Sequence, residues 1–437
     1  MVRWKGAAIT YKMKETDKEN QINENSLEQM LEEKNLRVAL KRVVTNKGSP
    51  GVDLMTVEEL PQYLKDNWIS IKEDLQSGRY KPSPIKRVEI PKPNGGVRQL
   101  GIPTVLDRFI QQALMQVMQT KWEKDFSEYS YGFRPGKSAH MAVAQAQKYV
   151  QQGYNWVVDI DLEKFFDKVN HDRLMSKCAQ KIQDTRILKL ISSYLKVGVL
   201  KNGIISLSHE GTPQGGPLSP LLSNLVLDEL DQELESKGLR FIRYADDCNI
   251  YVKSKRAAMR VMNQTTRFIT DTLKLKVNEQ KSAVDRPWNR KVLGFSLVMV
   301  RSKVKIKPAP SSMVRFKDKI REITKRSNGR SVEQVVAKLT PYIRGWKNYF
   351  CFSDVKSSFK GLDSWIRRKL RCMIWKQWGK RRYRELRARG IECYTAWVTS
   401  KSGHGPWRIS QSPALVRTLN VKFFESLKLP VLIEVTR

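Results

Sequence analysis

The sequence predicts an α+β fold, and three observations lead to this prediction. Residues 156–169 and 241–252 are apolar, β-branched and aromatic runs interrupted by aspartates, a pattern typical of strands. The second run has a two-residue polar step at its centre, which indicates two antiparallel strands joined by a tight turn. Most other segments, and much of residues 301–390, repeat apolar side chains at helical spacing.

The net charge predicts a polyanionic partner. Lys and Arg number 80 against 44 Asp and Glu, which gives +36 in 437 residues. A chain of this length has room for roughly two to four domains. No run of about 18 apolar residues and no signal-peptide core is present, so we expect nucleic acid rather than a membrane as the partner. Five scattered cysteines without a C-x-x-C pair indicate free thiols in a reducing compartment.

The first hundred residues predict an extension, a helix and a hairpin. Residues 1–25 are polar with little apolar periodicity, which is typical of a mobile extension. A helix is expected from Ser26, because Ser26 and Gln29 match a capping box. Residues 79–103 contain two short strand-like runs around a Pro-Asn-Gly-Gly turn, so we expect a β-hairpin there.

Two cations flank the turn of this predicted hairpin. Lys92 and Arg98 lie six residues apart and both can face one groove. An arginine there would hold a triphosphate by its planar fork, and a lysine would hold it as a point charge. The alternative is that both are solvated turn charges, which the residues alone favour.

Residues 104–126 and 138–152 are helical by pattern, and an aromatic and basic segment lies between them. Tyr131, Phe133 and Arg134 would suit a nucleic-acid surface, because bases stack on aromatic rings and phosphates attract arginine. The alternative is that the aromatic residues belong to the core.

Two acidic strands predict one shared metal site. Asp159 and Asp161 lie on one face of the first strand, and Asp246 and Asp247 occupy the turn of the second. Two ionised carboxylates about 4 Å apart repel by roughly 4 kcal/mol at an effective dielectric of about 20, so such a pair usually needs a cation. Hard oxygen ligands select Mg²⁺. A solvated Asp-Asp turn is the alternative, but two acidic strands in one chain favour a metal site.

A Gly- and Pro-rich loop, Gly211–Pro220, separates the two acidic strands. Glycines let the backbone approach a ligand closely, and Ser219-Pro220 is expected to begin the following helix. An ordinary loop is the alternative. Residues 255–273 predict an amphipathic helix, and Lys281 follows it.

Most of the excess positive charge lies in residues 301–390. This segment holds 27 Lys and Arg against 6 Asp and Glu, which is +21 of the total. We expect three helices whose basic outer faces follow the phosphates of a duplex. A solvated helix face is the alternative.

The last segment, residues 391–437, predicts a loop and one short helix. Trp397, His404, Trp407 and Arg408 fall in the expected loop. The apolar helix is expected near residues 416–429.

Five segments, in a fixed order, carry a resemblance to a known family. They are Tyr131–Pro135, Asp161-x-x-x-x-Phe166, Gly211–Pro220, Tyr244-Ala245-Asp246-Asp247 and Tyr342–Phe350. Over roughly residues 26 to 437 the chain resembles the reverse transcriptases encoded by group II introns, and five motifs in order are highly specific. No endonuclease-like segment is seen, so the compact, endonuclease-lacking bacterial type (group IIC-like) is the closer match.

The resemblance implies the architecture of a right-hand polymerase. Fingers and palm, with an antiparallel palm sheet, would span residues 26–300. An all-α thumb, the maturase (X) domain, would span residues 301–385, and a small DNA-binding (D) segment residues 386–437.

The resemblance also implies the chemistry, which is extension of a DNA primer on an RNA template by two-metal nucleotidyl transfer. Asp161, Asp246 and Asp247 would hold two Mg²⁺ ions, for which Mn²⁺ is a possible substitute. The Leu162 backbone carbonyl would be a further ligand. Lys281 matches the position of a general acid to the leaving pyrophosphate, with a surface lysine as the alternative.

Four residues would bind the incoming deoxynucleotide. Lys92 and Arg98 would hold its phosphates, and Gln214 would lie against its base. Phe166, beneath the sugar, would exclude a 2′-hydroxyl. The residues expected to contact nucleic acid are Tyr131, Phe133, Arg134, Arg344, Trp346, Lys347, Arg367, Arg368 and Arg371.

The implied partners are an RNA template, the intron RNA, a DNA primer or target DNA, and dNTPs, in the bacterial cytoplasm. The same protein would act as a maturase that aids splicing of its intron RNA. Two alternatives are kept: an RNA-binding splicing cofactor with an idle polymerase site, and a retron-like or defence reverse transcriptase. The intact acids argue against an idle site, and the basic thumb favours the intron family.

Overall fold

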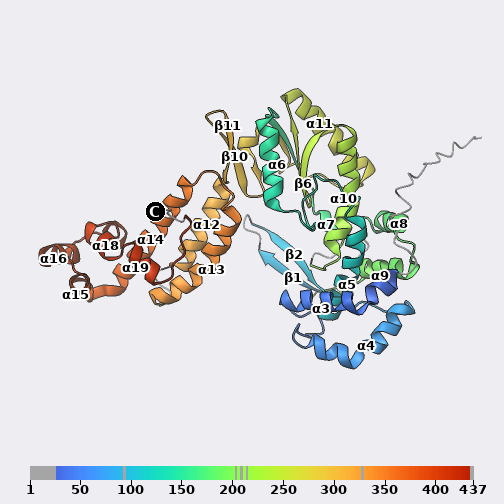
Figure 1. Cartoon of the computed structure of the whole chain (residues 1–437), viewed down its shortest axis with the longest axis horizontal. Helices are drawn as coiled ribbons and strands as arrows, with labels where there is room; N and C mark the ends of the chain where they lie inside the picture. Colours follow the sequence, from blue (N-terminus) through green and yellow to red (C-terminus); the bar gives the residue numbers. More distant parts are fainter. Residues whose placement is uncertain are drawn as a thin grey trace, which may run out of the picture. The chain divides into compact units, whose positions relative to one another are not determined.

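The computed structural model describes residues 26–91, 95–201, 204–206, 210–212, 215–325 and 329–433. The extension predicted for residues 1–25 therefore lies outside the described residues. The chain divides into two compact units (Figure 1). The first is formed by Met1–Tyr149 with Tyr154–Asp285, and the second by Val150–Gly153 with Arg286–Arg437.

A four-stranded antiparallel sheet lies at the centre of the first unit and confirms the predicted α+β class. Its strand order is β6-β7-β3-β8, and we call it the palm sheet. The middle strand β3 buries Val157, Val158 and Ile160, and helix α11 packs against it. The strands are β3 (Trp156–Asp161), β6 (Arg240–Tyr244), β7 (Asp247–Val252) and β8 (Ala283–Asp285).

A second sheet in the same unit, of order β2-β1-β4-β5, contains the hairpin predicted for residues 79–103. Its first two strands pair antiparallel, with Ile90 opposite Arg98, so Arg98 follows the turn directly. The tip, residues 92–94, lies outside the described residues. The strands are β1 (Ile85–Pro91), β2 (Val97–Ile102), β4 (Val199–Lys201) and β5 (Ile204–Ser206).

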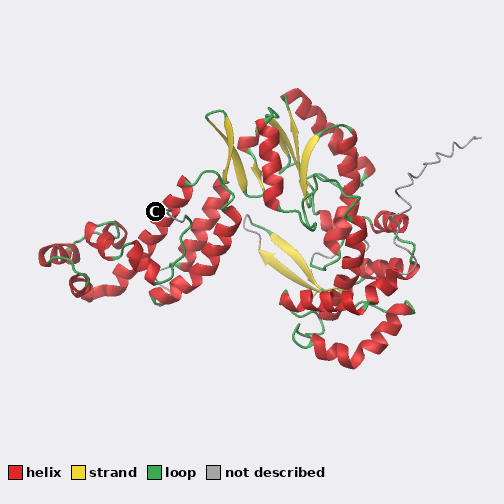
Figure 2. Cartoon of the chain, viewed as in Figure 1, coloured by secondary structure: helices red, strands yellow, loops and turns green. Residues whose placement is uncertain are grey.

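Helices pack around the palm sheet, whereas the hairpin of β1 and β2 projects from the helices at its base (Figures 1 and 2). The helix predicted from Ser26 is two helices, because Glu32 has an extended backbone (ψ 135°) that breaks it. Ser219-Pro220 begins α10 as predicted. The helices are α2 (Ser26–Leu31), α3 (Glu33–Thr45), α4 (Leu60–Gln76), α5 (Val105–Trp122), α6 (Ala139–Gln151), α7 (Phe165–Lys168), α8 (His171–Lys181), α9 (Thr185–Lys196), α10 (Ser219–Ser236) and α11 (Lys255–Arg267), which a π-helical turn (Phe268–Thr272) extends.

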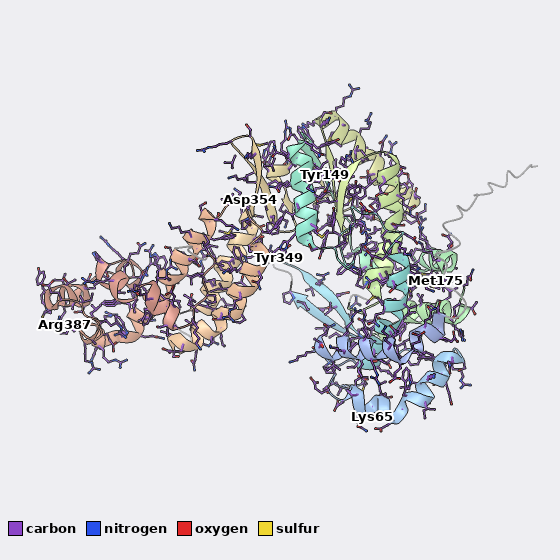
Figure 3. All side chains as sticks on the ribbon, in the orientation of Figure 1. Lys65, Tyr149, Met175, Tyr349, Asp354 and Arg387 are labelled. Carbon is purple, nitrogen blue, oxygen red and sulfur yellow. The ribbon has the colours of Figure 1, made fainter. Side chains whose placement is uncertain are left out.

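The main part of the second unit begins at Arg286, upstream of the boundary predicted at residue 300, and its first element is a three-stranded antiparallel sheet of order β11-β10-β9. Polar contacts of two residues labelled in Figure 3, Tyr349 of α13 and Asp354 of the loop that follows, join this part of the chain to the strand region. The Tyr349 hydroxyl donates to the Leu293 carbonyl (2.8 Å), and the Ile306 amide donates to Asp354 (2.7 Å). The elements are β9 (Lys291–Val292), β10 (Phe295–Val300), β11 (Lys303–Pro308), α12 (Pro310–Ile323), α13 (Val332–Phe350) and α14 (Ser357–Trp378).

The end of the second unit is more helical than predicted. Trp397 lies within α16, and Trp407 and Arg408 lie within α17, where a loop was expected. The predicted helix at residues 416–429 is two helices, because the Asn420 side chain caps a new one by accepting from the Phe423 amide. The helices are α15 (Arg382–Ala388), α16 (Cys393–Lys401), α17 (Pro406–Ile409), α18 (Pro413–Thr418) and α19 (Val421–Ser426). Among all the described helices, none has the length and apolar character needed to cross a membrane.

Candidate active site

The pairing of β3 with β7 brings the acids of the two predicted acidic strands together. The antiparallel register sets Asp161 opposite Asp247, at the last pair of the ladder. Tyr244 pairs with Asp247 across β6 and β7, so Ala245 and Asp246 form the turn between them. We call Tyr244–Asp247 the Asp-Asp turn. Asp161 therefore lies beside this turn, although it is 85 residues earlier in the chain.

The surroundings of Asp246 and Asp247 disfavour the ionised forms of both side chains. Loss of hydration is the main cause that raises the pKa of Asp246, and the Asp161 carboxylate adds to it. The pKa of Asp247 is raised to about 7, first by loss of hydration and then by the charges of Asp246 and Asp161. Asp247 is an exposed residue, yet the protein atoms around its carboxylate still reduce the hydration of that group. Both groups would be stabilised as anions by a cation.

Lys281 supplies one positive charge to this cluster. Its ammonium lies 3.1 Å and 3.2 Å from the two carboxylate oxygens of Asp161. The backbone around Asp161 is fixed as well, because its amide donates to the Ser282 hydroxyl (3.0 Å) and its carbonyl accepts from the Asn278 amide (2.8 Å). The Asp161 carbonyl and the Glu163 amide, on either side of Leu162, make the backbone hydrogen bonds to residues 276–278. The Leu162 carbonyl is not used in these bonds.

The donor set of this cluster fits a hard divalent cation. Three carboxylates and a backbone carbonyl are oxygen ligands of the type that Mg²⁺ prefers. The pKa values of two of the carboxylates, Asp246 and Asp247, are raised first by loss of hydration and then by the negative charge of their neighbours. Within the described residues, no group of three His, Cys, Asp or Glu side chains is arranged so that it could hold a metal ion. The oxygen donors therefore fit the ion in chemistry, and the Lys281 ammonium lies against one of the three carboxylates, that of Asp161.

We expect an Asp247→Asn variant of the metal-free protein to be more thermostable than the parent at pH 8. An aspartate whose pKa rises from 3.8 unfolded to about 7 folded binds its proton more tightly when folded. That contribution to stability is complete below pH 4 and is lost as the pH rises to 7. The gain in melting temperature should therefore shrink between pH 8 and pH 5.5.

Thermal unfolding in a chelator at both pH values measures this difference. The matched control is Glu279→Gln, which neutralises an exposed acid near the same segment. It should give no pH-dependent change. An Asp247→Asn variant that is equally stabilised at both pH values would contradict the raised pKa.

A pocket of about 500 Å³ opens beside the Asp-Asp turn. Arg98 from β2 and Phe166 from α7 line it together with Asp246, and Arg98 is a source of positive charge at the Asp246 carboxylate. Ser219, at the start of α10, and Gly215, in the loop before it, form another wall. The pocket thus brings a phosphate-binding candidate, a sugar-binding candidate and a catalytic candidate together. Lys92 and Gln214, predicted for the same role, lie outside the described residues.

The two aromatic residues that begin α7, the candidate Phe166 and its neighbour Phe165, have different surroundings. Phe165 is buried, and its ring packs edge-on against Phe166 at 5.3 Å between centroids. Phe166 is half-buried and reaches the pocket. Two neighbouring acids have other surroundings than the three clustered carboxylates. Asp159 accepts a 2.9 Å hydrogen bond from the Asn249 side-chain amide, and Asp167 is exposed on α7.

The aromatic and basic segment before α6 is only partly available to a ligand. Phe133 is 48% exposed and lines the pocket. Tyr131 is buried, and so is Arg134, whose guanidinium bonds Glu123 (2.9 Å) and the Ser130 carbonyl (3.0 Å). The expectation that Tyr131 and Arg134 face nucleic acid is therefore not supported, because their side chains are used inside the protein.

The basic residues predicted on α13 and α14 also divide into two groups. Arg344 is exposed, whereas Trp346 packs in an aromatic cluster against Phe316 (4.4 Å). Lys347 and Arg367 are half-buried. Arg344 alone among these has the open surface that the prediction assumed.

Arg368 and Arg371 attach the C-terminal helices to α14. The Arg371 guanidinium donates to the carbonyls of Ser410 (2.8 Å) and Leu419 (3.3 Å). Burial and the charges of Arg367 and Arg368 lower its pKa. The Arg368 guanidinium lies 3.8 Å from the Trp407 ring centre and donates to the Trp407 carbonyl (3.2 Å). Both arginines were predicted as nucleic-acid contacts, and their geometry is structural instead.

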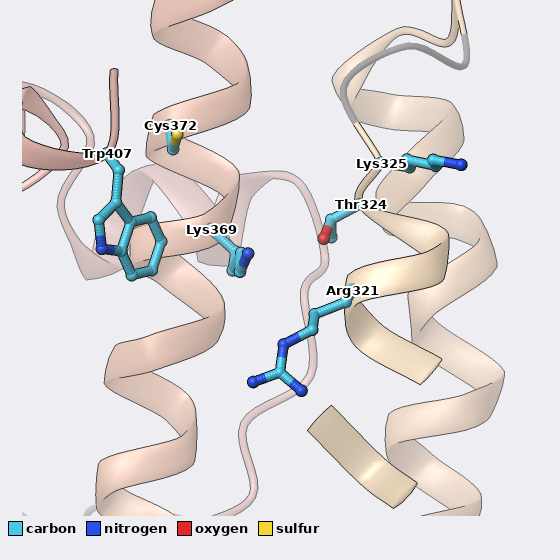
Figure 4. A pocket seen from close by; sticks show the side chains of 6 residues that line it. All are labelled: Arg321, Thr324, Lys325, Lys369, Cys372 and Trp407. Carbon is cyan, nitrogen blue, oxygen red and sulfur yellow. The ribbon is translucent and has the colours of Figure 1, made fainter. Parts of the chain in front are cut away.

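A second pocket, of about 280 Å³, lies in the same unit between α12, α14 and α17. Lys369 on α14 and Arg321 on α12 reach into the space between these helices (Figure 4). The Lys369 ammonium lies 4.9 Å from the Trp407 ring centre, and Lys325 and Thr324 complete the wall. Several cations beside an aromatic ring suit a phosphate and its base. Net charge indicated such a surface, but only the structure identifies these residues.

Two family models match separate parts of the chain. Residues 90–297 match the reverse transcriptase (RNA-dependent DNA polymerase) model, which covers the palm sheet and the Asp-Asp turn. Residues 313–390 match the group II intron maturase-specific domain, which covers most of α12 to α15.

Known proteins agree with these matches. Protein YkfC of Escherichia coli (strain K12) is 32% identical over 309 residues, which cover 61% of this chain and 81% of YkfC. Group II intron-encoded protein LtrA of Lactococcus lactis subsp. cremoris is 28% identical over 361 residues, which cover 65% of this chain and 60% of LtrA. The chain thus spans less than two thirds of LtrA.

A solved structure, titled partial Cas6-RT-Cas1–Cas2 complex, matches 57% of this chain and 43% of that chain. The sequence identity is 26% and the TM-score is 0.36, which is too low to carry an argument. The two family models and the similarity to YkfC identify the family. The chain belongs to the group II intron-encoded reverse transcriptases, and it joins an RNA-dependent DNA polymerase domain to a maturase-specific domain.

Proposed function

We propose that Asp161, Asp246 and Asp247 are the catalytic carboxylates of this polymerase and that they hold two Mg²⁺ ions. The observation that supports this most is the register of β3 against β7, which sets Asp161 opposite Asp247 with Asp246 in the adjoining turn. When bound, the ions would activate the primer hydroxyl and neutralise the charge that develops on the leaving pyrophosphate. The Leu162 carbonyl is available as a further ligand.

The pocket beside the Asp-Asp turn is the proposed site of the incoming dNTP. Arg98 would bind its phosphates with two parallel hydrogen bonds. The Phe166 ring would lie against the sugar and disfavour a 2′-hydroxyl. Lys281 would hold a proton within reach of the pyrophosphate once it leaves Asp161. Lys92 and Gln214 are retained as proposals for the phosphates and the base.

The substrates that we propose are an RNA template and a DNA primer, and we propose that the second unit carries a polymer-binding surface of its own. Its matched maturase-specific domain supports binding of a group II intron RNA and a role in splicing. Phe133, Arg344 and the pocket around Lys369 are the exposed candidates for these contacts.

Primer extension on an RNA template, with dNTPs and Mg²⁺, tests the polymerase. Template-dependent DNA synthesis that stops in a chelator is the expected result. A protein that binds the intron RNA and promotes splicing, yet extends no primer under any divalent ion, would instead be a splicing cofactor with an idle site.

We expect the double variant Arg321→Gln/Lys325→Gln to bind RNA with a weaker salt dependence. Each phosphate contact that is lost lowers the slope of log K against log salt by about 1. Filter binding at several salt concentrations measures the slope.

The control variant is Arg371→Gln. It should instead lower the melting temperature, because it leaves the Ser410 and Leu419 carbonyls without the guanidinium that donates to them. An unchanged slope in the double variant would remove this pocket from the interface.

A further inference from the structure

An arginine is fully buried in the strand that leads into the Asp-Asp turn. Arg243 on β6 is 1% exposed, and it meets Asp231 of α10, which is 0% exposed. The guanidinium bonds both carboxylate oxygens, with Nε at 2.7 Å and Nη2 at 2.5 Å. This two-point pairing fixes the plane of the guanidinium relative to α10.

The remaining nitrogen of the same guanidinium reaches the turn itself. Nη1 donates to the Ala245 carbonyl (3.1 Å) and to the Asn224 side-chain oxygen (3.0 Å). Ala245 has a positive φ of 56°, a conformation that costs energy for a residue with a side chain. The bond from Arg243 therefore acts on the residue of the turn that most needs support.

A second side chain of α10 holds the turn from its other flank. The Asn224 amide nitrogen donates to the Gly132 carbonyl (2.9 Å), and Asn224 is 1% exposed. The segment around Gly132 runs beside β6, because the Tyr131 amide donates to the Arg243 carbonyl (2.8 Å). Asn224 thus connects this segment, the buried arginine and α10.

The same helix forms a wall of the nucleotide pocket. Ser219 and Pro220, in its first turn, line that pocket, and Asp231 follows twelve residues later. Twelve residues correspond to about 18 Å along a helix axis. One rigid element therefore contacts both the candidate nucleotide site and, through Arg243, the candidate catalytic turn.

Stability alone is a weak reason for such a pair. Removing two charges from water costs about as much as their pairing returns, and apolar residues of similar size often serve a core equally well. The Arg243–Asp231 pair differs from an apolar pair in one respect: it presents a directed donor to the Ala245 carbonyl. Its benefit would be geometric.

We propose that Arg243, Asp231 and Asn224 are positioning residues, which hold the Asp-Asp turn at a fixed place relative to α10 and the nucleotide pocket. This proposal rests on the proposed function, in which Asp246 is catalytic. It assigns to three buried residues a role in the rate of synthesis, without contact with substrate.

The main test is the double variant Arg243→Met/Asp231→Leu, which replaces the pair by apolar side chains. We expect it to fold with a near-parental melting temperature and to bind RNA as the parent does. Its kcat for primer extension should fall by about ten- to a hundredfold, because a displaced catalytic group costs about that much. Its KM for dNTP should change less than threefold, and it should need more Mg²⁺ for half-maximal rate.

Two single variants keep the test decisive if the double variant does not fold. Arg243→Lys retains the charge beside Asp231, but an ammonium cannot bond Asp231, Asn224 and Ala245 in one plane. Asn224→Ala removes both the bond to the Gly132 carbonyl and the bond from the Arg243 guanidinium, and it leaves the Arg243–Asp231 pair in place. Each should lower kcat and leave RNA affinity intact.

The matched control is Glu229→Gln on the same helix. Glu229 pairs with Arg173 (2.5 Å) and Lys177, which both belong to α8 and not to the Asp-Asp turn. It should lower the melting temperature and leave kcat within about twofold of the parent.

The outcomes separate this proposal from the one beneath it. If Asp246→Asn retains synthesis, the proposed catalytic role is wrong. If Asp246→Asn is inactive but folded Arg243→Lys and Asn224→Ala variants keep the parental kcat and Mg²⁺ requirement, the buried pair is only structural and the positioning role is refuted. A loss of kcat in Glu229→Gln equal to theirs would also refute it.

Discussion

The Asp246→Asn variant is expected to lose DNA synthesis by roughly a thousandfold or more while its affinity for RNA stays close to the parental value. Asp246 stands at the point of the Asp-Asp turn, beside Asp161 and in the wall of the nucleotide pocket. An amide of the same size keeps the turn's shape but removes the negative charge that a divalent ion needs. The basic surface of the second unit is untouched.

Primer extension and RNA filter binding, measured on one preparation, test this result. The matched control is Asp167→Asn, because Asp167 is an exposed acid only six residues after Asp161. It should synthesise DNA at the parental rate. Loss of RNA binding in Asp246→Asn, or continued synthesis, would show that the residue has another role.

The Gly132→Ala variant is expected to lose synthesis by about a hundredfold and to unfold at a lower temperature. An added Cβ at Gly132 would overlap the Ala245 backbone nitrogen and lie 3.0 Å from the Tyr244 carbonyl carbon. These are backbone atoms of the Asp-Asp turn, so no side-chain rotation can relieve the overlap. The turn or the segment around Gly132 must move.

Single-turnover primer extension and thermal unfolding measure the two effects. Gly361→Ala on α14 is the control, because an added Cβ there meets no atom within 4 Å. Alanine should stabilise that helix by about 0.5–1 kcal/mol and leave synthesis unchanged. A fully active Gly132→Ala protein would mean that the turn tolerates displacement, contrary to the role proposed for its supports.

The acids of the candidate site were predictable because they interrupt apolar strands. A carboxylate such as Asp161 at the end of a buried run is costly without a cation, so its presence indicates a partner from the sequence alone. The period-two rule and the tight turn then define which acids share one edge of a sheet. Register and strand order, which bring Asp161 to Asp247, agree with that expectation.

The supports of the site were not predictable in the same way. Arg243 is one basic residue among 80 Lys and Arg, and charge does not reveal whether its partner is solvent, phosphate or a buried Asp231. The same ambiguity led to the expectation that Arg134 and Arg371 bind nucleic acid. Both instead donate hydrogen bonds to backbone carbonyls, Arg134 to that of Ser130 and Arg371 to that of Ser410, and buried carbonyls need such donors. Only long-range contacts decide between these uses. One signal was available: an arginine at an inward position of an apolar strand.

The contact of Lys281 with Asp161 has a consequence for storage of the enzyme. When a chelator removes the divalent ions, the Lys281 ammonium remains in contact with the Asp161 carboxylate at the end of its strand. The strands then keep their alignment, and reloading requires one side chain to swing aside rather than a sheet to re-form. Dialysis against a chelator should therefore inactivate the enzyme reversibly. Returning magnesium should restore the full rate of synthesis without a slow refolding phase.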